Sequence, residues 1–472
     1  MRSGVRSGMV PRAEVRGKQP AFERNIREGR MTCDEPPSVV LNPRRAAFAA
    51  TLAILTGCGA VTPSAVPPPV NDPTPSLTTA SASPGWDPIQ ADLDRLIAAL
   101  DTTHPEAFHG ISRDEFVAAV DAYEQHLPDL DDQQAVVGLM RVVAMLSREG
   151  RDGHQFALPR PGHEGPVLPL RIYEFAEGVY VTDTPSAGES LIGARITAID
   201  GTAMDEVLAA VEPLVPRDGP ATVAAFRPVL LLRTEVLCGL GVIGDGAVEI
   251  SVVRPDGSAV TTALEPMAFD AYVAWAGDFG MLRLPADDRM QYLADVRPLT
   301  IAAIDEATVY VRYRNVIPPD VADARELLAS ASVDRLILDL RQNPGGDNTT
   351  FGPLLTLVQE FAADHSGGLT VLTDRVTFSA ASNLATRVEQ STDAIFIGEA
   401  MGGGLNFWDD VRWVGLDALP IPMQVGVSTR YWQFAAADDP RLTIEPDIEL
   451  PVTAADFFAG RDPVLDAALG ER

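Results

Sequence analysis

The sequence has almost no lysine: Lys18 is the only one among 472 residues, and it lies close to the N-terminus. A serine nucleophile needs a neighbouring base, which in proteins is usually histidine or lysine. If the N-terminal leader described below is removed, no lysine remains and a serine–lysine dyad is excluded. Any activated serine in the rest of the chain then depends on one of the six histidines.

Cysteine is also scarce, with three residues: Cys33, Cys58 and Cys238. No cluster of cysteine and histidine has metal-ligand spacing, and no glycine-rich loop has the phosphate-binding pattern, so neither a metal nor a nucleotide cofactor is implied. Lipidation of Cys58 would leave Cys238 without a partner, so we expect no intrachain disulfide. We predict that Cys238 is a small buried hydrophobe.

Positive charge is in short supply: 37 lysine and arginine residues face 66 acidic residues, for a net charge of −29. Such a balance argues against nucleic acid or anionic lipid as the main partner. Hydrophobic residues make up 46% and charged residues 22% of the chain, as in an ordinary globular protein. The length is sufficient for two or three domains.

The N-terminal region lacks an apolar run long enough to span a bilayer, because Ala46–Leu55 is too short. Residues 1–57 hold ten basic and five acidic residues, and Arg44-Arg45 directly precede the apolar run. This pattern is typical of a secretory signal. The following Leu55-Thr56-Gly57-Cys58 resembles the lipobox of bacterial lipoproteins, whose cysteine is acylated; a short buried helix with a chance cysteine is the alternative.

The resemblance implies an extracytoplasmic protein that Cys58 anchors to the cell membrane through lipid. Met31 would give a more usual signal length than Met1. Residues 58–86 are rich in proline, serine and threonine, which predicts a flexible tether.

Residues 87–160 are predicted to be helical. Leu93, Leu96 and Leu100 follow helical spacing, Ser112–Glu115 is a capping-box pattern, and a third helix is expected from about Gln133. The pattern stops at a glycine-rich turn that leads into His154.

Residues 161–268 change to a β-rich pattern. Gly193–Thr202 predicts a strand and a tight Asp-Gly turn, and Pro255-Asp256-Gly257 predicts a hairpin. The module resembles a PDZ-like domain, which would capture an extended peptide by strand addition. A purely structural spacer is the alternative.

The stretch Leu336–Gly403, within residues 269–472, organises the rest of the chain. It alternates short apolar strands with helical segments, which predicts βαβ units and an α/β fold with a parallel sheet. The Gly345-Gly346 turn and Ser379 both follow strands, at the sheet edge where such folds place their chemistry.

Ser379 is the candidate nucleophile, because it follows a strand and a loop and begins a helix. The free amides at a helix N-terminus favour developing negative charge. The amides of Gly346 and Ala380 are the predicted oxyanion hole. The alternative is that Ser379 only caps the helix, which is the commoner role of such a serine.

Among the histidines, His154 stands out through its Asp152-Gly153-His154 turn, although a lone loop histidine is more often structural. The remaining candidates for the base are in polar loops or at a helix end: His104, His109, His126, His163 and His365.

Several motifs together resemble the S41 family, the tail-specific or C-terminal-processing serine peptidases: Asp339–Gly346, Thr377–Ala381, Ile397–Glu399, Gly402-Gly403 and Pro446-Asp447-Ile448. The resemblance implies an N-terminal helical region, a PDZ-like module and a ClpP/crotonase-like βαβ catalytic domain. One branch of the family uses a lysine base, and the matching region, Gly402–Leu405, has none.

The tricorn-like branch uses a histidine, and Asp152-Gly153-His154 matches its place. That branch has serine where this chain has Gly153, and it completes the site with a late glutamate. Asp438, Asp439 and Glu445 are the candidates here for that acidic residue.

The resulting hypothesis is a serine peptidase that acts on extracytoplasmic proteins or peptides, with Ser379 as nucleophile and His154 as general base. Two alternatives stay open: a catalytically inactive binding protein with a peptidase fold at the cell surface, and a crotonase-type acyl-CoA enzyme. A secreted location counts against the acyl-CoA enzyme.

Overall fold

The computed structural model describes residues 87–185, 190–277, 282 and 297–470. These residues all belong to one unit of the chain. The predicted leader, the lipidation site at Cys58 and the tether lie outside the described residues. In the part of the chain that the structure describes, no helix is both long and apolar enough to cross a membrane.

The predicted helical region forms three helices. Ser112 accepts a hydrogen bond from the Glu115 amide (3.2 Å), which is half of the predicted capping box, whereas the complete reciprocal box forms between Asp131 and Gln134. The third helix begins at Asp132, close to the predicted start. The elements are α2 (Asp87–Thr103), α3 (Arg113–His126), η1 (Leu127–Asp129), α4 (Asp132–Ala144) and η2 (Met145–Ser147).

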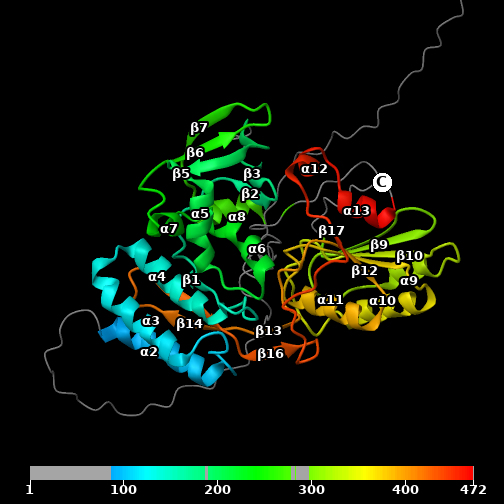
Figure 1. The fold of residues 1–472 in the computed structure, drawn as a ribbon, viewed down its shortest axis with the longest axis horizontal. Coiled ribbons are helices and arrows are strands. Elements are labelled where there is room, and N and C mark those ends of the chain that lie inside the picture. Colours follow the sequence, from blue (N-terminus) through cyan, green and yellow to red (C-terminus); the bar gives the residue numbers. More distant parts are fainter. Residues whose placement is uncertain (1–86, 186–189, 278–281, 283–296, 471–472) are drawn as a thin grey trace, which may run out of the picture. The chain divides into compact units, whose positions relative to one another are not determined.

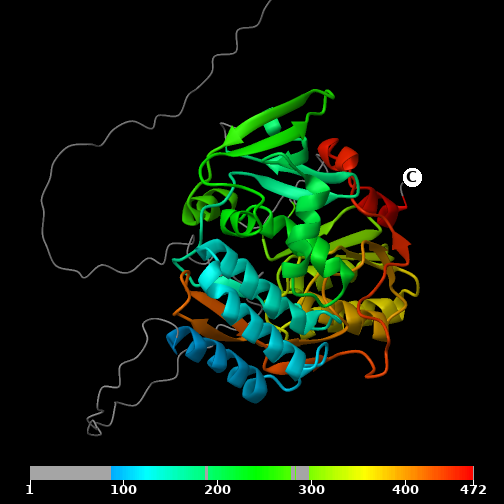
Figure 2. The same cartoon turned by 60° about the vertical axis from the view of Figure 1, so that its left-hand side comes forward.

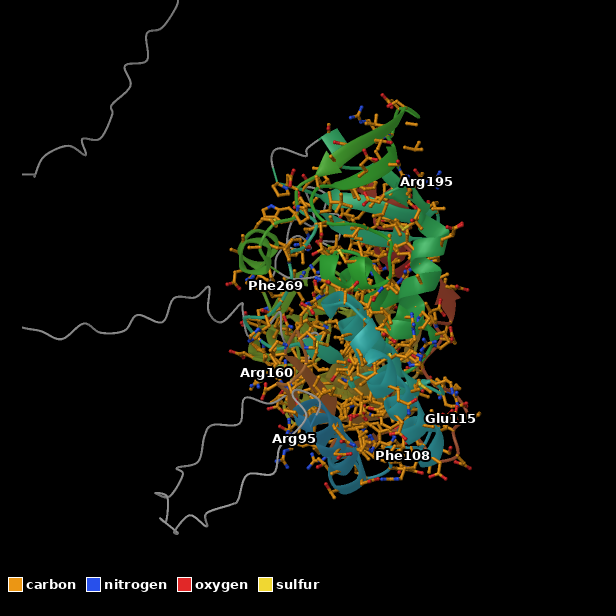
Figure 3. All side chains as sticks on the ribbon, turned by 90° about the vertical axis from the view of Figure 1, so that its left-hand side faces the viewer. Arg95, Phe108, Glu115, Arg160, Arg195 and Phe269 are labelled. Atoms are coloured by element: carbon orange, nitrogen blue, oxygen red, sulfur yellow. The ribbon has the colours of Figure 1, made fainter. Side chains whose placement is uncertain are left out.

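These helices pack against a small antiparallel sheet whose strands come from distant parts of the chain: β1 (Ala157–Pro159), β14 (Arg412–Leu416) and β15 (Met423–Val427), in the order β1-β15-β14. The Asp92 carboxylate of α2 accepts the Ala418 amide (2.8 Å). Arg95 and Arg160, both labelled in Figure 3, approach Gly415 of β14 from two different elements. The helices therefore share one apolar core with a C-terminal hairpin.

The β-rich module forms a sheet in the order β2-β3-β4-β6-β7, with β5 paired to β4. The predicted Pro255-Asp256-Gly257 hairpin connects β6 and β7, and Gly257 has φ = +83°, which suits glycine. Its elements are β2 (Arg171–Phe175), β3 (Gly178–Asp183), β4 (Arg195–Ile199), β5 (Thr202–Ala203), α5 (Met204–Val211), η4 (Glu212–Leu214), α6 (Pro220–Leu230), α7 (Thr234–Gly239), β6 (Val248–Val253), β7 (Ala259–Leu264) and α8 (Phe269–Ala276).

The second large sheet confirms the predicted α/β fold. Its order is β17-β12-β11-β10-β9-β8, and every neighbouring pair is parallel except β8 with β9. In Figures 1 and 2 this sheet belongs to the part of the molecule coloured from yellow-green to red. The strands are β8 (Leu299–Ala303), β9 (Thr308–Tyr313), β10 (Arg335–Asp339), β11 (Leu369–Thr373), β12 (Ile395–Gly398) and β17 (Ile448–Glu449).

Both faces of this sheet are buried, as expected for parallel strands. Helices α10 (Gly352–Asp364) and α11 (Ala380–Ser391) share an apolar core with one face, and α13 (Pro463–Leu469) covers the other (Figure 1). The remaining elements are α9 (Ala322–Leu328), α12 (Ala454–Phe458) and an antiparallel ribbon of β13 (Asn406–Asp409) and β16 (Arg430–Gln433).

Candidate active site

Ser379 lies immediately before α11, and its backbone is strained. Its φ of +54° and ψ of −127° are rare for a residue with a side chain. The hydroxyl makes no capping hydrogen bond, so the alternative in which Ser379 merely caps the helix is not what the structure shows. The residue is fully buried. Strain that packing holds in place at a helix N-terminus is typical of a functional position.

The loop before Ser379 is held by Asp374. Its carboxylate accepts hydrogen bonds from the amides of Gln342 (3.1 Å), Val376 (2.9 Å) and Thr377 (3.1 Å). Burial raises the pKa of Asp374 to about 6, with the Glu399 carboxylate adding to the effect. The Phe378 amide then donates to the Asn343 carbonyl (3.0 Å), which ties this loop to the glycine turn.

A buried ionic cluster at the start of the same turn holds it in place. Arg341 lies between Asp339 (2.7 Å) and Asp462 (2.8 Å), at the N-terminus of α13. Arg341 holds the pKa of Asp339 below its ordinary value, against the effect of burial. A buried arginine of this kind needs both charge and hydrogen-bond partners, and here it has them.

The glycine turn packs directly on the candidate nucleophile. A Cβ on Gly345 would lie 2.6 Å from the Ser379 Cβ and 3.0 Å from the Ala380 amide nitrogen. Val316 pins the turn, because its amide donates to the Gly345 carbonyl (2.8 Å). Among the described residues, the amides of Gly346 and Ala380 donate to no protein acceptor. The glycine turn thus packs on Ser379, and both predicted oxyanion donors are free to bind a substrate oxygen.

His154 lies opposite, on the loop between η2 and β1. Its ring is sandwiched between Phe378 (centroids 4.6 Å apart) and Phe407 (5.3 Å). It is 2% exposed, and neither ring nitrogen has a hydrogen-bond partner. Burial lowers the pKa of His154, and the Asp218 carboxylate opposes the shift. The imidazole is therefore neutral at pH 7 and has a nitrogen free to accept a proton.

Asp409, at the end of β13, joins the two sides. The Ser379 hydroxyl donates to Asp409 Oδ2 (3.2 Å), and the same oxygen lies 3.5 Å from His154 Nε2. The serine and the imidazole are thus within reach of a single oxygen but share no hydrogen bond of their own. Burial raises the pKa of Asp409 well above its ordinary value, which favours the protonated, neutral form of this carboxyl group.

Asp409 was not among the acidic residues predicted from the sequence, and the three predicted candidates do not take its place. Asp438 and Glu445 are exposed, and Asp439 pairs with Arg441 (2.9 Å). One signal was present: Asp409 ends an aromatic segment, Asn406-Phe407-Trp408, where a carboxylate would be buried. The separation of Asp409 from Ser379 in the sequence matches no pattern that would predict that the two side chains are close.

A second polar cluster lies behind the His154 loop. Asp152 is buried and is bonded to His104 Nε2 (3.1 Å) and to the Ser428 hydroxyl (2.9 Å), with His109 Nε2 3.6 Å away. Burial alone would raise the pKa of Asp152, but these two histidines hold it below its ordinary value. His104 and His109 thus interact with Asp152 and not with Ser379.

The other histidines are away from Ser379. His126 is exposed and bonds the Ala122 carbonyl (2.6 Å), His365 stacks on Phe361, and His163 is exposed. No group of His, Cys, Asp and Glu side chains within the described ranges could hold a metal ion. Cys238 is partly exposed rather than buried as predicted; it lies next to the C-terminal residue of α7.

The fold and the site together describe an α/β protein that has a strained serine at a helix N-terminus and a neutral buried histidine beside it. No protein-family model and no curated protein sequence matches the chain. Solved structures do match its fold. A serine-to-alanine mutant of CPAF has 14% identity and a TM-score of 0.57, covering 82% of this chain and 98% of CPAF.

Mature CPAF in complex with lactacystin has 14% identity and a TM-score of 0.55, covering 82% of this chain and 97% of CPAF. The photosystem II D1 C-terminal processing protease has 19% identity and a TM-score of 0.37, covering 77% and 93%. At these identities, the CPAF structures show that the chain shares their fold along nearly their whole length.

Proposed function

We propose that the protein is a serine peptidase in which Ser379 is the nucleophile and His154 the general base. One observation carries the proposal: the buried His154 and the strained Ser379, 225 positions later in the chain, both lie within 3.5 Å of Asp409 Oδ2, and the predicted oxyanion donors at Gly346 and Ala380 have no protein acceptor among the described residues. Buried polar groups without partners are rare in folded proteins and need an explanation. A substrate carbonyl and a transferring proton would satisfy these groups.

In the proposed reaction, the Ser379 hydroxyl turns from Asp409 toward His154 and attacks the carbonyl carbon of a peptide bond. His154 Nε2 takes the hydroxyl proton, and the amides of Gly346 and Ala380 stabilise the oxyanion. His154 then returns the proton to the leaving amine, which forms an acyl-enzyme. Water attacks the acyl-enzyme with His154 again as base, which releases the second product and restores Ser379.

The sequence resemblance to the S41 peptidases supports this assignment, because its motifs lie together at the site. Asp339–Gly346 supplies the anchored turn, and Thr377–Ala381 carries the nucleophile. The Gly402-Gly403 motif packs behind it: a Cβ on Gly403 would lie 2.9 Å from the Ser379 amide nitrogen. Motifs that are separate in the sequence thus form one wall of the site.

We further propose an extracytoplasmic location, with lipid attached to Cys58 and a tether of residues 58–86. The lipobox-like sequence and the basic flank before it support this proposal. Metabolic labelling with an alkyne fatty acid tests it: label is expected in the full chain and lost in Cys58→Ala. Retention of label in that variant would contradict the location of the anchor.

The test of activity is covalent labelling by a fluorophosphonate probe. Wild-type protein is expected to label at Ser379; Ser379→Ala should not label at all, and His154→Ala should label at least about 100-fold more slowly. Ser382→Ala is the matched control, because Ser382 is equally buried on α11 but donates to the Thr377 carbonyl (3.1 Å). Labelling that persists in Ser379→Ala would show that another residue reacts.

A second candidate function is a binding protein that keeps the fold without activity. It is favoured by one observation: Asp409 rather than His154 accepts the Ser379 hydroxyl, and all three side chains are buried. The same experiment decides between them. If wild-type protein stays unlabelled over pH 5 to 9 while a known serine peptidase labels in parallel, the binding function stands and the peptidase proposal fails.

A further inference from the structure

One carboxylate of the β-rich module contacts the loops around the candidate active site. Asp218 lies in the loop between η4 and α6, and its side chain is completely buried. Asp218 Oδ1 accepts the Gly153 amide (2.6 Å), and Oδ2 accepts the Gly404 amide (3.2 Å). Each carboxylate oxygen therefore holds a different loop, one from residues 150–154 and the other from residues 402–404.

The same short segment makes further bonds to both loops. The Asp218 carbonyl accepts the Arg151 amide (2.9 Å), and the Arg217 carbonyl accepts the Asp152 amide (3.2 Å). Thr222, in the first turn of α6, donates to the Gly402 carbonyl and accepts the Asp218 amide (3.1 Å). The segment thus holds the two loops through backbone as well as side-chain bonds.

These two loops carry opposite halves of the candidate site. Gly153 directly precedes His154, and the Gly402–Gly404 loop backs Ser379 through the Gly403 amide, which donates to the Thr377 carbonyl (3.1 Å). His154 has no hydrogen bond of its own to fix its position. Whatever holds its loop at a set distance from the Ser379 loop also sets the distance between base and nucleophile.

The absence of a side chain at position 153 fits this arrangement. A Cβ on Gly153 would lie 3.0 Å from the Asp218 amide nitrogen and 3.1 Å from its carboxyl carbon. A side chain at position 153 would therefore crowd Asp218 and require it to shift. Where the resembled family has a serine beside its histidine, this chain has a glycine that makes room for a carboxylate from another module.

We propose that Asp218 is a positioning residue that clamps the His154 loop to the Gly402–Gly404 loop and so sets the alignment of His154 with Ser379. The inference deepens the proposed peptidase function and rests on it. Burial disfavours the charged form of Asp218 and raises its pKa to about 6. His154 and the two bonded amides favour the charged form and oppose this shift. Desolvating a carboxylate to this extent needs strong compensation, and the two amide bonds provide it.

The first arm of the test is independent of activity. Amide hydrogen exchange is compared in Ser379→Ala alone and combined with Asp218→Ala or Asp447→Ala. Asp447→Ala is the control for loss of a carboxylate elsewhere: Asp447 is exposed, and it accepts one backbone amide, that of Phe396 (2.8 Å), at β12 and not in either loop. We expect residues 150–154 and 402–404 to exchange at least about 10-fold faster with Asp218→Ala only. Unchanged exchange in either loop overturns the clamp.

The second arm measures fluorophosphonate labelling with Ser379 intact. Asp218→Ala should lower the maximal labelling rate about 10- to 100-fold, with the half-saturating probe concentration unchanged within about twofold, because alignment and not binding is lost. Asp218→Asn keeps one acceptor oxygen and should fall between wild type and Asp218→Ala. A maximal rate that is unchanged although both loops exchange faster also overturns the proposal.

The two arms separate this inference from the function on which it rests. If wild-type protein does not label, the peptidase proposal fails and Asp218 positions no base, whereas the exchange result still shows whether Asp218 joins the loops. If wild type labels and Asp218→Ala changes neither the exchange of the two loops nor the labelling rate, the peptidase proposal stands and Asp218 is only a buried structural residue.

Discussion

The two halves of the candidate site are held in opposite ways. The Ser379 half is fixed by hydrogen bonds: Asp374 alone accepts three backbone amides from two loops, and the Asn343 carbonyl accepts the Phe378 amide, which ties the glycine turn to the nucleophile loop. The His154 ring makes no hydrogen bond and lies between two aromatic rings, with Asp218 holding the preceding amide. Directional bonds fix atoms to a few tenths of an ångström, whereas ring stacking lets an imidazole slide in its own plane.

The difference has a chemical consequence. A nucleophile and an oxyanion hole have to be placed accurately before the reaction, because their contribution depends on preorganisation. A base that first accepts and then returns a proton has to serve two partners, the serine and the leaving amine. We therefore expect changes to the Ser379 half to be severe and changes to the His154 half to be graded.

The largest effect is expected from Gly345→Ala. The new Cβ would lie 2.6 Å from the Ser379 Cβ, at a φ of +108° that alanine rarely adopts. Fluorophosphonate labelling should fall at least about 100-fold, and the free energy of unfolding should fall by about 1–3 kcal/mol in urea titrations. Gly352→Ala is the control, because nothing lies within 4 Å of its added Cβ and it begins α10. Equal labelling in both variants would contradict a preorganised nucleophile.

A moderate effect is expected from Phe407→Leu, which removes one of the two rings around His154. The maximal labelling rate should fall about 10-fold, since the imidazole keeps its place only part of the time, and stability should fall by about 1–2 kcal/mol. Phe361→Leu removes the ring of another stacked Phe–His pair, Phe361 with His365 (4.4 Å), away from the site. It should cost similar stability without changing the rate. Equal rates in the two variants would show that stacking does not hold the base.

The pH dependence should show a smaller effect, a displaced acid limb. Burial lowers the pKa of His154 from 6.5, and only the neutral imidazole can accept the serine proton. The midpoint of the labelling rate against pH is therefore expected below 6.5, so that more than half of the maximal rate remains at that pH. The unfolded chain binds this proton more readily, so the His154 contribution to stability decreases as the pH falls below 6.5. A midpoint above 7 would contradict a buried neutral base.

The smallest effect is expected from Asp409→Asn. Because burial shifts Asp409 toward its protonated, neutral form, an amide of the same shape should change the labelling rate at pH 7 by less than about threefold. In the wild type, the folded state binds a proton that the unfolded state releases above its ordinary pKa of 3.8. Stability contributed by Asp409 therefore decreases as pH rises above that value, and Asp409→Asn should lack this slope in urea titrations at pH 5 and 8. A loss of 100-fold in rate would show instead that Asp409 acts as a charged partner.

The Ser379 half could be predicted because it is continuous in sequence. The strands β10, β11 and β12, the glycine turn and helix α11 all lie between Arg335 and Gly398, and local pattern was enough to locate them. His154 was predicted as the base for a different reason: the chain lacks a lysine for this role, and a glycine-rich turn precedes this histidine. The structure brings it to Ser379, which no local pattern could show.

Asp409 and Asp218 could not be found in this way. Asp409 depends on the β13–β16 ribbon, whose strands are separated by the β14–β15 hairpin, and Asp218 depends on how the β-rich module docks. Aspartate next to glycine or aromatic residues is common in ordinary turns, and burial alone makes these two unusual. The three-stranded sheet that joins β1 to β14 and β15 was missed for the same reason, since long-range pairing has no local signature.

The buried Arg341 has a consequence for how the protein is made. Its second carboxylate partner, Asp462, lies 121 residues further along the chain. During synthesis, the glycine turn beside Ser379 can therefore reach its final electrostatic balance only after the ribosome has passed Asp462 and that residue has left the exit tunnel. Until then, Arg341 has one counter-charge instead of two, and the nucleophile half should stay loose. A growing chain that has not yet reached Asp462 would therefore carry its candidate nucleophile without part of the support that the folded protein gives to it.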